Sequence, residues 1–168
     1  MQKYVFKKYN SEYPVFFTLE KKKIIKILGS TVNIEHVGST AIPFLGGKGI
    51  IDIVIGVSKL RLTETKNKLE GAGYEFRDKA SCPKRLFFRI NYPYKNEKRR
   101  AHIHLTEFNS QNWKELIIFR DYLLNNPDAV KEYVKIKKEA VKKDLGDGEK
   151  YRKHKERFIA SILKKVLK

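Results

Sequence analysis

The segment from Ile50 to Val57 constrains the fold more than any other part of the chain. Six of its eight residues are Ile or Val, a pattern typical of a strand that is covered on both faces. Asp52 is the only charged residue in this run. A buried, isolated carboxylate is costly unless it meets a metal, another cation or hydrogen-bond donors. The structural alternative is an aspartate that caps a loop or pairs with Lys48 or an arginine.

A polar loop from Gly38 to Gly49 precedes this strand and begins Gly38-Ser39-Thr40. A glycine, two hydroxyls and free backbone N–H groups are the parts that hold a phosphate. The spacing matches neither the P-loop nor the dinucleotide-binding fingerprint. No Ser-His-Asp arrangement surrounds the hydroxyls, so they fit binding better than nucleophilic attack. His36, just before the loop, either orients it through a hydrogen bond or is a core histidine.

The remaining pattern is mixed in the first two-thirds of the chain and helical at the end. Ser11 is a candidate helix cap with Pro14 in the first turn. A turn over 92–98 would join the fourth and fifth of the strands named below, 86–91 and 101–106, as a hairpin. Helices are expected over 11–28, 63–70, 113–124, 127–144 and 149–167, and strands over 33–37, 50–57, 74–78, 86–91 and 101–106. This order predicts an α+β fold, one domain over 1–168 with a helical part over 107–168.

The charge is strongly positive, with 37 Lys and Arg against 19 Asp and Glu. This balance favours an anionic partner such as a nucleotide, a phosphorylated metabolite or RNA, and the alternative is a lysine-rich solubility coat. Residues 77–100 hold nine Lys and Arg against two acids, and residues 131–168 hold fourteen against six. The second segment alternates in sign around Lys137, which is typical of a solvated helix face. If both segments flank the Gly38 loop, they form a positive rim that steers RNA or a coenzyme.

Three further observations concern the cellular setting. Cys82 is the only cysteine, which excludes an internal disulfide and a zinc site made of cysteines alone. No stretch approaches the ~18 apolar residues of a membrane span. The first eight residues are too charged for the apolar core of a signal peptide. We therefore expect a cytoplasmic protein with no membrane partner.

The motif from His36 to Pro43, followed by Lys48 and by Ile50-Ile51-Asp52-Ile53, resembles that of the GrpB family, a branch of the nucleotidyltransferase superfamily. The likeness continues along the chain in the order that the family shows: Gly73-Tyr74, Arg85–Arg89, His102–Leu105, Phe119–Leu123, and Tyr151 with Lys155, Phe158 and Ile159. The resemblance implies a nucleotidyltransferase-like mixed β-sheet flanked by helices, with C-terminal helices. The family carries a lysine at position 48, which favours phosphate contact there.

In active members of that superfamily a Gly-Ser turn holds a nucleoside triphosphate, and two acids one residue apart bind divalent metal for in-line transfer. A third acid lies on a later strand. Here Asp52 takes the first acid position, but the second is Val54, and His102 or His104 takes the third. A Mg²⁺ site with one carboxylate would be weak, whereas imidazole suits zinc or another transition metal. Asp52, His102 and His104 would therefore bind Mg²⁺, Mn²⁺ or Zn²⁺, or line a metal-free phosphate pocket.

The predicted site combines Asp52 as the catalytic residue with a set of phosphate- or nucleotide-binding residues. Arg89 belongs to it because it interrupts an apolar strand, whereas Arg99 and Arg100 read as solvated residues at a hairpin end. The binding set is Gly38, Ser39, Thr40, Lys48, Arg89 and His104. Three functions follow: nucleotidyl transfer, nucleotide or coenzyme binding without catalysis, for which Val54 is the best evidence, and RNA association through the basic helices.

Overall fold

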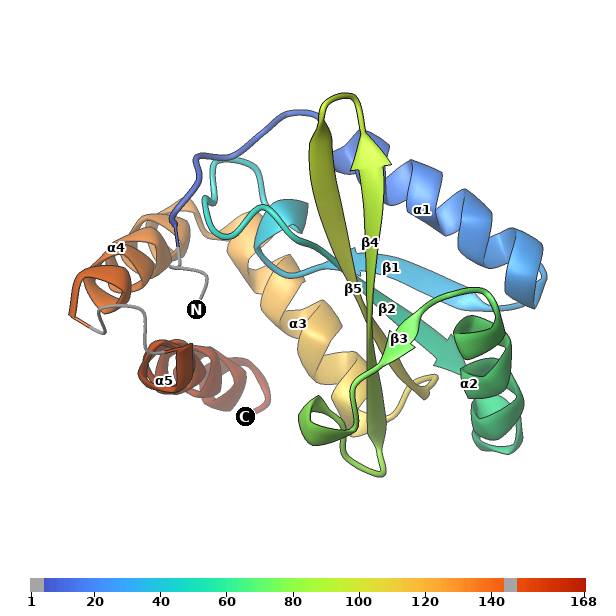
Figure 1. Cartoon of the computed structure of the whole chain (residues 1–168). Coiled ribbons are helices and arrows are strands. Elements are labelled where there is room, and N and C mark those ends of the chain that lie inside the picture. Colours follow the sequence, from blue (N-terminus) through green and yellow to red (C-terminus); the bar gives the residue numbers. More distant parts are fainter. Residues whose placement is uncertain (1–4, 144–147) are drawn as a thin grey trace.

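The computed structural model describes residues 5–143 and 148–168, and its centre is a five-stranded mixed sheet (Figure 1). The sheet order is β1-β2-β5-β4-β3; β2 and β5 are parallel, and the other neighbours are antiparallel. The strands are β1 (Asn33–Val37), β2 (Ile51–Val57), β3 (Glu75–Phe76), β4 (Arg85–Tyr94) and β5 (Glu97–Glu107). The helices are α1 (Tyr13–Leu28), α2 (Leu62–Gly71), α3 (Gln111–Asn125), α4 (Pro127–Lys143) and α5 (Gly148–Val166). The α+β prediction is confirmed. The predicted break between the last two helices, around Gly146, lies outside the described residues.

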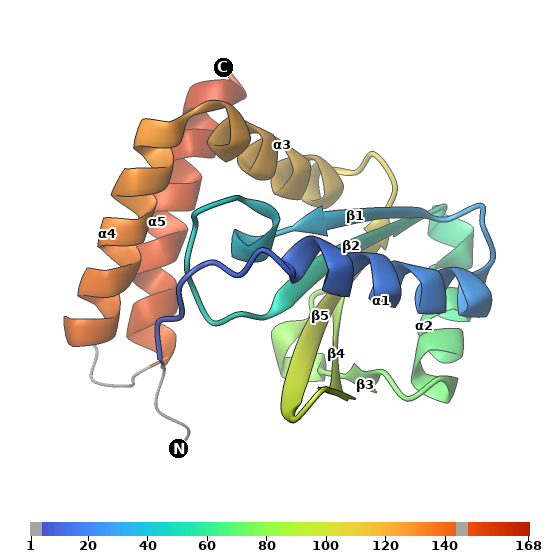
Figure 2. The same cartoon turned by 90° about the horizontal axis from the view of Figure 1, so that it is seen from above.

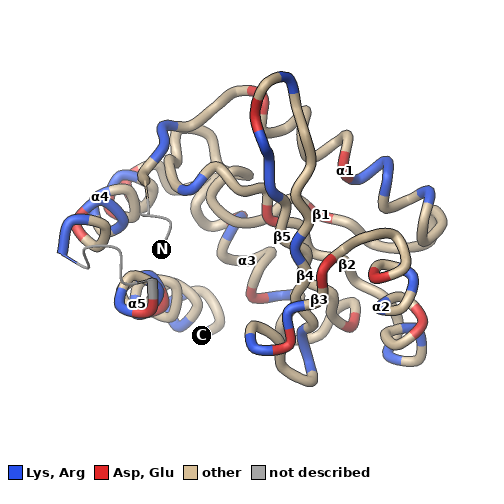
Figure 3. The backbone as a smooth tube through the Cα atoms, in the orientation of Figure 1, with Lys and Arg blue, Asp and Glu red and all other residues tan. Residues whose placement is uncertain are grey.

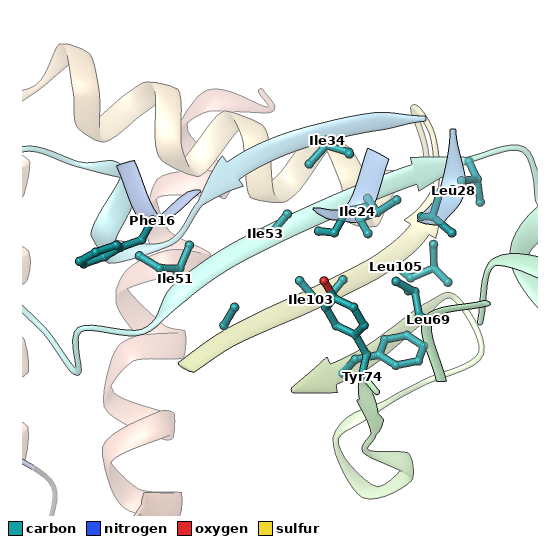
Figure 4. Close-up of a cluster of buried hydrophobic side chains, with 14 of the residues drawn as sticks. Phe16, Ile24, Leu28, Ile34, Ile51, Ile53, Leu69, Tyr74, Ile103 and Leu105 are labelled. Atoms are coloured by element: carbon teal, nitrogen blue, oxygen red, sulfur yellow. The ribbon is translucent and has the colours of Figure 1, made fainter. Parts of the chain in front are cut away.

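The strand β2 is buried on both faces, as its run of β-branched residues predicts. Alternate residues of β2 and β5 face the helices α1 and α2, and the main apolar core lies there (Figure 4). Its members from these strands are Ile51, Ile53, Ile55, Val57, Ala101, Ile103 and Leu105. The other residues of β2, including Asp52 and Val54, therefore point to the opposite face of the sheet.

The opposite face is covered by α3 over β1 and β2. Trp113 packs with Val37 and Val54 in a small buried cluster. A Cβ at Gly56 would lie 2.7 Å from the Trp113 ring, so the glycine lets the helix approach the strand. Ser110 caps α3 by accepting a hydrogen bond from the Trp113 N–H at 3.3 Å.

The last two helices lie side by side beyond the loop between β1 and β2 (Figure 2). Ile42 and Leu45 of that loop are buried against residues of these helices and of α3, including Leu123, Tyr133 and Phe158. The loop is thus held between the sheet and the helix pair. Among residues 5–143 and 148–168 there is no helix with the length and apolar character needed to cross a membrane.

Two local predictions were wrong. The N-cap of α1 is Glu12 and not Ser11; Asn10 Oδ1 accepts a hydrogen bond from the Glu12 N–H at 2.8 Å. The β4–β5 ladder continues through residues 92–94 and 97–100, so the turn is only Lys95-Asn96. Pro93 suggested a turn, but β3 pairs with β4 only at residues 88–89. Pro93 therefore lies at a sheet edge, where a missing N–H is tolerated.

Candidate functional site

A cavity of about 120 Å³ lies where the Gly38 turn meets β2, β5 and the last two helices. Its lining combines hydroxyls, lysines and one carboxylate. The lining residues are Ser39, Thr40, Lys48, Gly49, Ile50, Asp52, His102, Lys137, Tyr151 and Lys155. Ser39, Thr40, Lys48, Asp52 and His102 were all predicted as site residues, and the fold brings them to one place.

Gly38 is required at the head of this cavity for two reasons. Its φ of 71° lies in the left-handed region that favours glycine. A Cβ there would also lie 2.5 Å from Asp52 Oδ2. The turn that follows, Ser39–Ala41, is a single 3₁₀ turn that points both hydroxyl residues toward the cavity. Gly38 therefore lets the turn lie directly against the carboxylate.

His36 positions the same turn. Its Nε2 is 2.9 Å from Thr40 Oγ1, and its ring stacks on Phe17 with centroids 4.8 Å apart. Burial lowers the pKa of His36 to about 4; Asp52 opposes this shift and Arg120 adds to it. The imidazole is therefore neutral at physiological pH. Of the two roles predicted for His36, the geometry favours orientation of the loop.

Asp52 is the centre of a contact with two imidazoles. Its Oδ1 is 3.3 Å from His102 Nδ1 and 3.5 Å from His104 Nε2. Burial alone would raise the pKa of Asp52, but the hydrogen bonds and positive charge of the two histidines outweigh it and hold that pKa well below its ordinary value. The carboxylate is thus ionised, although its side chain is only 26% exposed.

Both imidazoles lie against the same oxygen of Asp52. Among the described residues, no group of three or more His, Cys, Asp or Glu is placed to hold a metal ion. Phe87 also packs edge-on against both imidazoles, with centroids 4.9 and 5.2 Å away. Metal binding by Asp52, His102 and His104 stays a prediction.

Val54 explains why the magnesium pair of active superfamily members does not fit here. It is fully buried, packed with Val37 and Trp113 under α3. It shares a face with Asp52, because residues i and i+2 of a strand point the same way. Mg²⁺ prefers hard oxygen ligands, and this position supplies a methyl group to a dry cluster. The chain holds one carboxylate where two would be needed.

The most buried cation of the site is Lys137, whose residue is 1% exposed. Its Nζ donates to Ser39 Oγ at 2.5 Å and to the Gly46 carbonyl at 2.7 Å, and it lies 4.9 Å from the centre of the Tyr133 ring. Burial lowers its pKa to about 7, and repulsion from other lysines adds to that effect. This ammonium group is therefore bonded directly to the turn that follows Gly38.

Lys48 and Lys155 both lie close to the ring of Tyr151. Their Nζ atoms lie 5.4 and 5.3 Å from the centre of its ring. Burial lowers the pKa of each lysine; repulsion from Lys155 adds to the shift of Lys48, and Asp52 opposes both. Three lysines therefore crowd around one carboxylate.

Sequence reasoning placed Lys137 on a solvated face, which was wrong. The signal that could have found it is spacing: Tyr133, Lys137 and Ala140 stand at i, i+4 and i+7 and are all buried. They therefore lie on one helical stripe, the one that faces the core. Lys155 stands in the same way between Tyr151 and Phe158, both buried. A lysine on an apolar helical stripe is therefore expected to be buried, whereas a lysine within a run of charged residues is expected to be exposed.

The other predicted cations lie farther out. Arg89 is in register with His102 on β4, but its guanidinium donates to the Glu75 carboxylate at 2.8 and 2.9 Å. It does not line the cavity described above. Arg100 shares the cavity face of β5 and adds to the repulsion that lowers the pKa of Lys48. Parts of both basic segments thus reach the site.

Comparison with known proteins identifies the family to which the chain belongs. The model of the family described as GrpB protein matches residues 4–165. The chain belongs to the GrpB family. It is 34% identical over 153 residues to the Glutamate-rich protein GrpB of Alkalihalophilus pseudofirmus, with 89% of this chain and 88% of that protein covered. The family resemblance drawn from the His36–Pro43 motif is therefore confirmed.

Two solved structures are similar in fold. The crystal structure of the conserved protein GrpB from Enterococcus faecalis superposes with a TM-score of 0.79 at 25% identity, over 98% of this chain and all of that one. The Cid1 poly(U) polymerase, in a structure with MgGTP bound, superposes with a TM-score of 0.54 at 11% identity. That match covers 79% of this chain and 44% of the Cid1 chain. The fold is nucleotidyltransferase-like.

Proposed function

We propose that the cavity binds the phosphate groups of a nucleotide or a phosphorylated metabolite. The observation that carries this proposal is the contact of the Lys137 ammonium with Ser39 Oγ at the head of a cavity that Lys48 and Lys155 also line. Buried cations repel one another, and a multiply charged anion relieves that repulsion. Phosphate accepts hydrogen bonds from ammonium groups and hydroxyls, and lysine and hydroxyl side chains line this cavity.

The proposal is for binding without two-metal transfer. Asp52 Oδ1 contacts two imidazoles, and Val54 leaves no second carboxylate beside it. Nucleotidyl transfer is the alternative, for which the fold is the main support. It requires that Asp52 leave its histidine contacts to hold a metal.

Titration calorimetry with inorganic triphosphate and with ATP, in metal-free buffer, tests the binding. We expect Lys137→Met to weaken the binding of both ligands at least tenfold, because it removes an ammonium group that is bonded directly to the turn. Lys135→Met is the matched control, since Lys135 is exposed on the same helix. The absence of binding to the unmodified chain, or equal losses in the two variants, would overturn the proposal.

Asp52→Asn separates binding from metal-dependent transfer. If the site holds phosphate without metal, the variant binds triphosphate at least as tightly as the unmodified chain, because one negative charge has been removed. If a metal on Asp52 bridges the ligand, binding depends on Mg²⁺ or Mn²⁺ and is lost in the variant. In that case, nucleoside triphosphates labelled at the α-phosphate transfer their nucleotidyl group to an acceptor hydroxyl and release pyrophosphate with the unmodified chain alone.

A further inference from the structure

The face of the β4–β5 ladder that adjoins the cavity is a second charged surface. Directly opposed residues of an antiparallel pair share a face, so the register assigns this face from the position of His102. Four of its ten side chains are Lys or Arg, and none is acidic. The ten residues are Arg85, Phe87, Arg89, Asn91, Pro93, Lys98, Arg100, His102, His104 and Thr106.

The positive charge of this face is concentrated toward the hairpin turn. Figure 3 shows the run of Lys and Arg along β5 that leads to the turn. Lys98 is exposed, and the Arg100 guanidinium donates to the neutral amide oxygen of Asn91 at 2.8 Å. Arg89 differs, because Glu75 neutralises it. Lys98 and Arg100 therefore keep their full charge for a partner.

Aromatic groups lie next to these cations. Phe87 is partly exposed on the same face, with the imidazoles of His102 and His104 in edge contact with its ring. Flat rings beside cations on an open sheet are the parts that hold unpaired bases and their phosphates. An acidic peptide would use the cations but would have no use for the rings. A duplex hides the faces of its bases in the stack.

We propose that this face, from Lys98 to Phe87, binds single-stranded RNA. Phosphates lie along Lys98 and Arg100, and a base stacks at Phe87. This surface differs from the basic helices considered from sequence, because two of their lysines, Lys137 and Lys155, are turned into the cavity. The inference stands apart from phosphate binding in the cavity, although the two surfaces meet at His102.

Fluorescence anisotropy with a labelled twelve-nucleotide single-stranded RNA tests the surface across a salt series. We expect Lys98→Gln with Arg100→Gln to weaken binding at least tenfold and to reduce the slope of log K against log salt by about 1.4, the value for two lost phosphate contacts. Lys22→Gln with Lys26→Gln is the matched control, because both lysines are exposed on α1 across the sheet. The control changes affinity less than twofold.

Further arms identify the partner. Phe87→Leu weakens the single strand about tenfold and leaves a poly-glutamate peptide unaffected. Equal binding of a duplex, equal competition by poly-glutamate, or equal losses in the test and control pairs overturns the proposal. If the double variant folds poorly, Lys98→Gln alone, at an exposed position, gives about half the loss on a logarithmic scale. Lys137→Met reduces triphosphate binding and spares RNA, so failure of either proposal is visible separately.

Discussion

The two faces of the central sheet are built by the same strands and differ in almost every chemical respect. Toward α1 and α2, strands β2 and β5 present Ile and Leu side chains that are fully buried. Toward the cavity, the intervening residues are Asp52, Val54, His102 and His104. Alternation along a strand is thus enough to place a reactive cluster on the back of a dry core. A shift of one residue in the pairing of a strand would turn each of its side chains to the other face of the sheet.

A buried or partly buried carboxylate lies on each face, Glu20 on one and Asp52 on the other, and the contrast between these two is informative. On the apolar side, Glu20 is 1% exposed and accepts a hydrogen bond from the Tyr74 hydroxyl at 2.5 Å. Burial and the negative charge of Glu20 raise the pKa of Tyr74, so the hydroxyl keeps its proton and the hydrogen bond is retained. On the other side, Asp52 contacts histidines beside a cavity lined with lysines. Glu20 also pairs with Lys23 Nζ at 3.4 Å, so its partners are one hydroxyl and one lysine, and we interpret it as structural. Asp52 contacts two histidines beside three lysines, and we interpret it as part of the candidate site.

Of the substitutions that test the contrast between the two faces, Val54→Asp has the largest expected effect on stability. The change places a charge in the dry cluster with Trp113, and we expect a loss of about 4 kcal/mol in the free energy of unfolding, measured by urea denaturation. Val54→Ala, which makes only a small cavity, is the control and costs about 2 kcal/mol. A stable Val54→Asp protein with Mg²⁺-dependent transfer would show that the second acid position is accessible after all.

Ile103→Ala acts on the apolar face alone. Ile103 is fully buried between the strands and the helices, so the variant loses about 3 kcal/mol of unfolding free energy. Triphosphate affinity at 10 °C should stay within twofold, because the side chain points away from the cavity. A large loss of affinity in a folded variant would mean that the two faces are coupled through the sheet.

Gly38→Ala tests the close approach between the turn and Asp52. The alanine meets Asp52 Oδ2 and must adopt a φ of 71°, which together cost about 2 kcal/mol of stability. Triphosphate binding should fall with it, since the turn moves away from the carboxylate. Gly71→Ala is the control: a Cβ there meets nothing within 4 Å, and unfolding by urea should show no loss.

The sequence predicted the parts of this contrast that depend on local chemistry. The β-branched run of β2, its lone aspartate and the glycine before the hydroxyls are all visible in a few residues, and the family motif extends them. Lys137 could not be placed in the same way. Its burial depends on contact with Ser39, which lies 98 residues away in the chain, and on the packing of α4 against the loop. Pro93 misled for a related reason, because only the sheet order shows that its position is an edge.

The smallest expected effect concerns His36, which lies near the end of β1 on the α1 side of the sheet and contacts Thr40 of the turn. Its pKa of about 4 in the folded chain is below the value of about 6.5 for an unfolded histidine. The unfolded state therefore binds more protons between these values, so the contribution of His36 is complete above pH 6.5 and declines as the pH falls toward 4. His36→Gln keeps a polar partner for Thr40 and removes this dependence.

We expect the stability advantage of the unmodified chain over His36→Gln to shrink by about 1 kcal/mol between pH 7 and pH 5.5, measured by urea denaturation. At pH 5.5 the carboxylates are still ionised in the unfolded chain, because their pKa values lie near 4. The lowered pKa of Asp52 therefore affects stability only at lower pH, and the difference isolates the imidazole. An advantage that is constant or grows on acidification would mean that His36 is protonated in the folded chain. It would then add a fourth cation to the rim of the cavity.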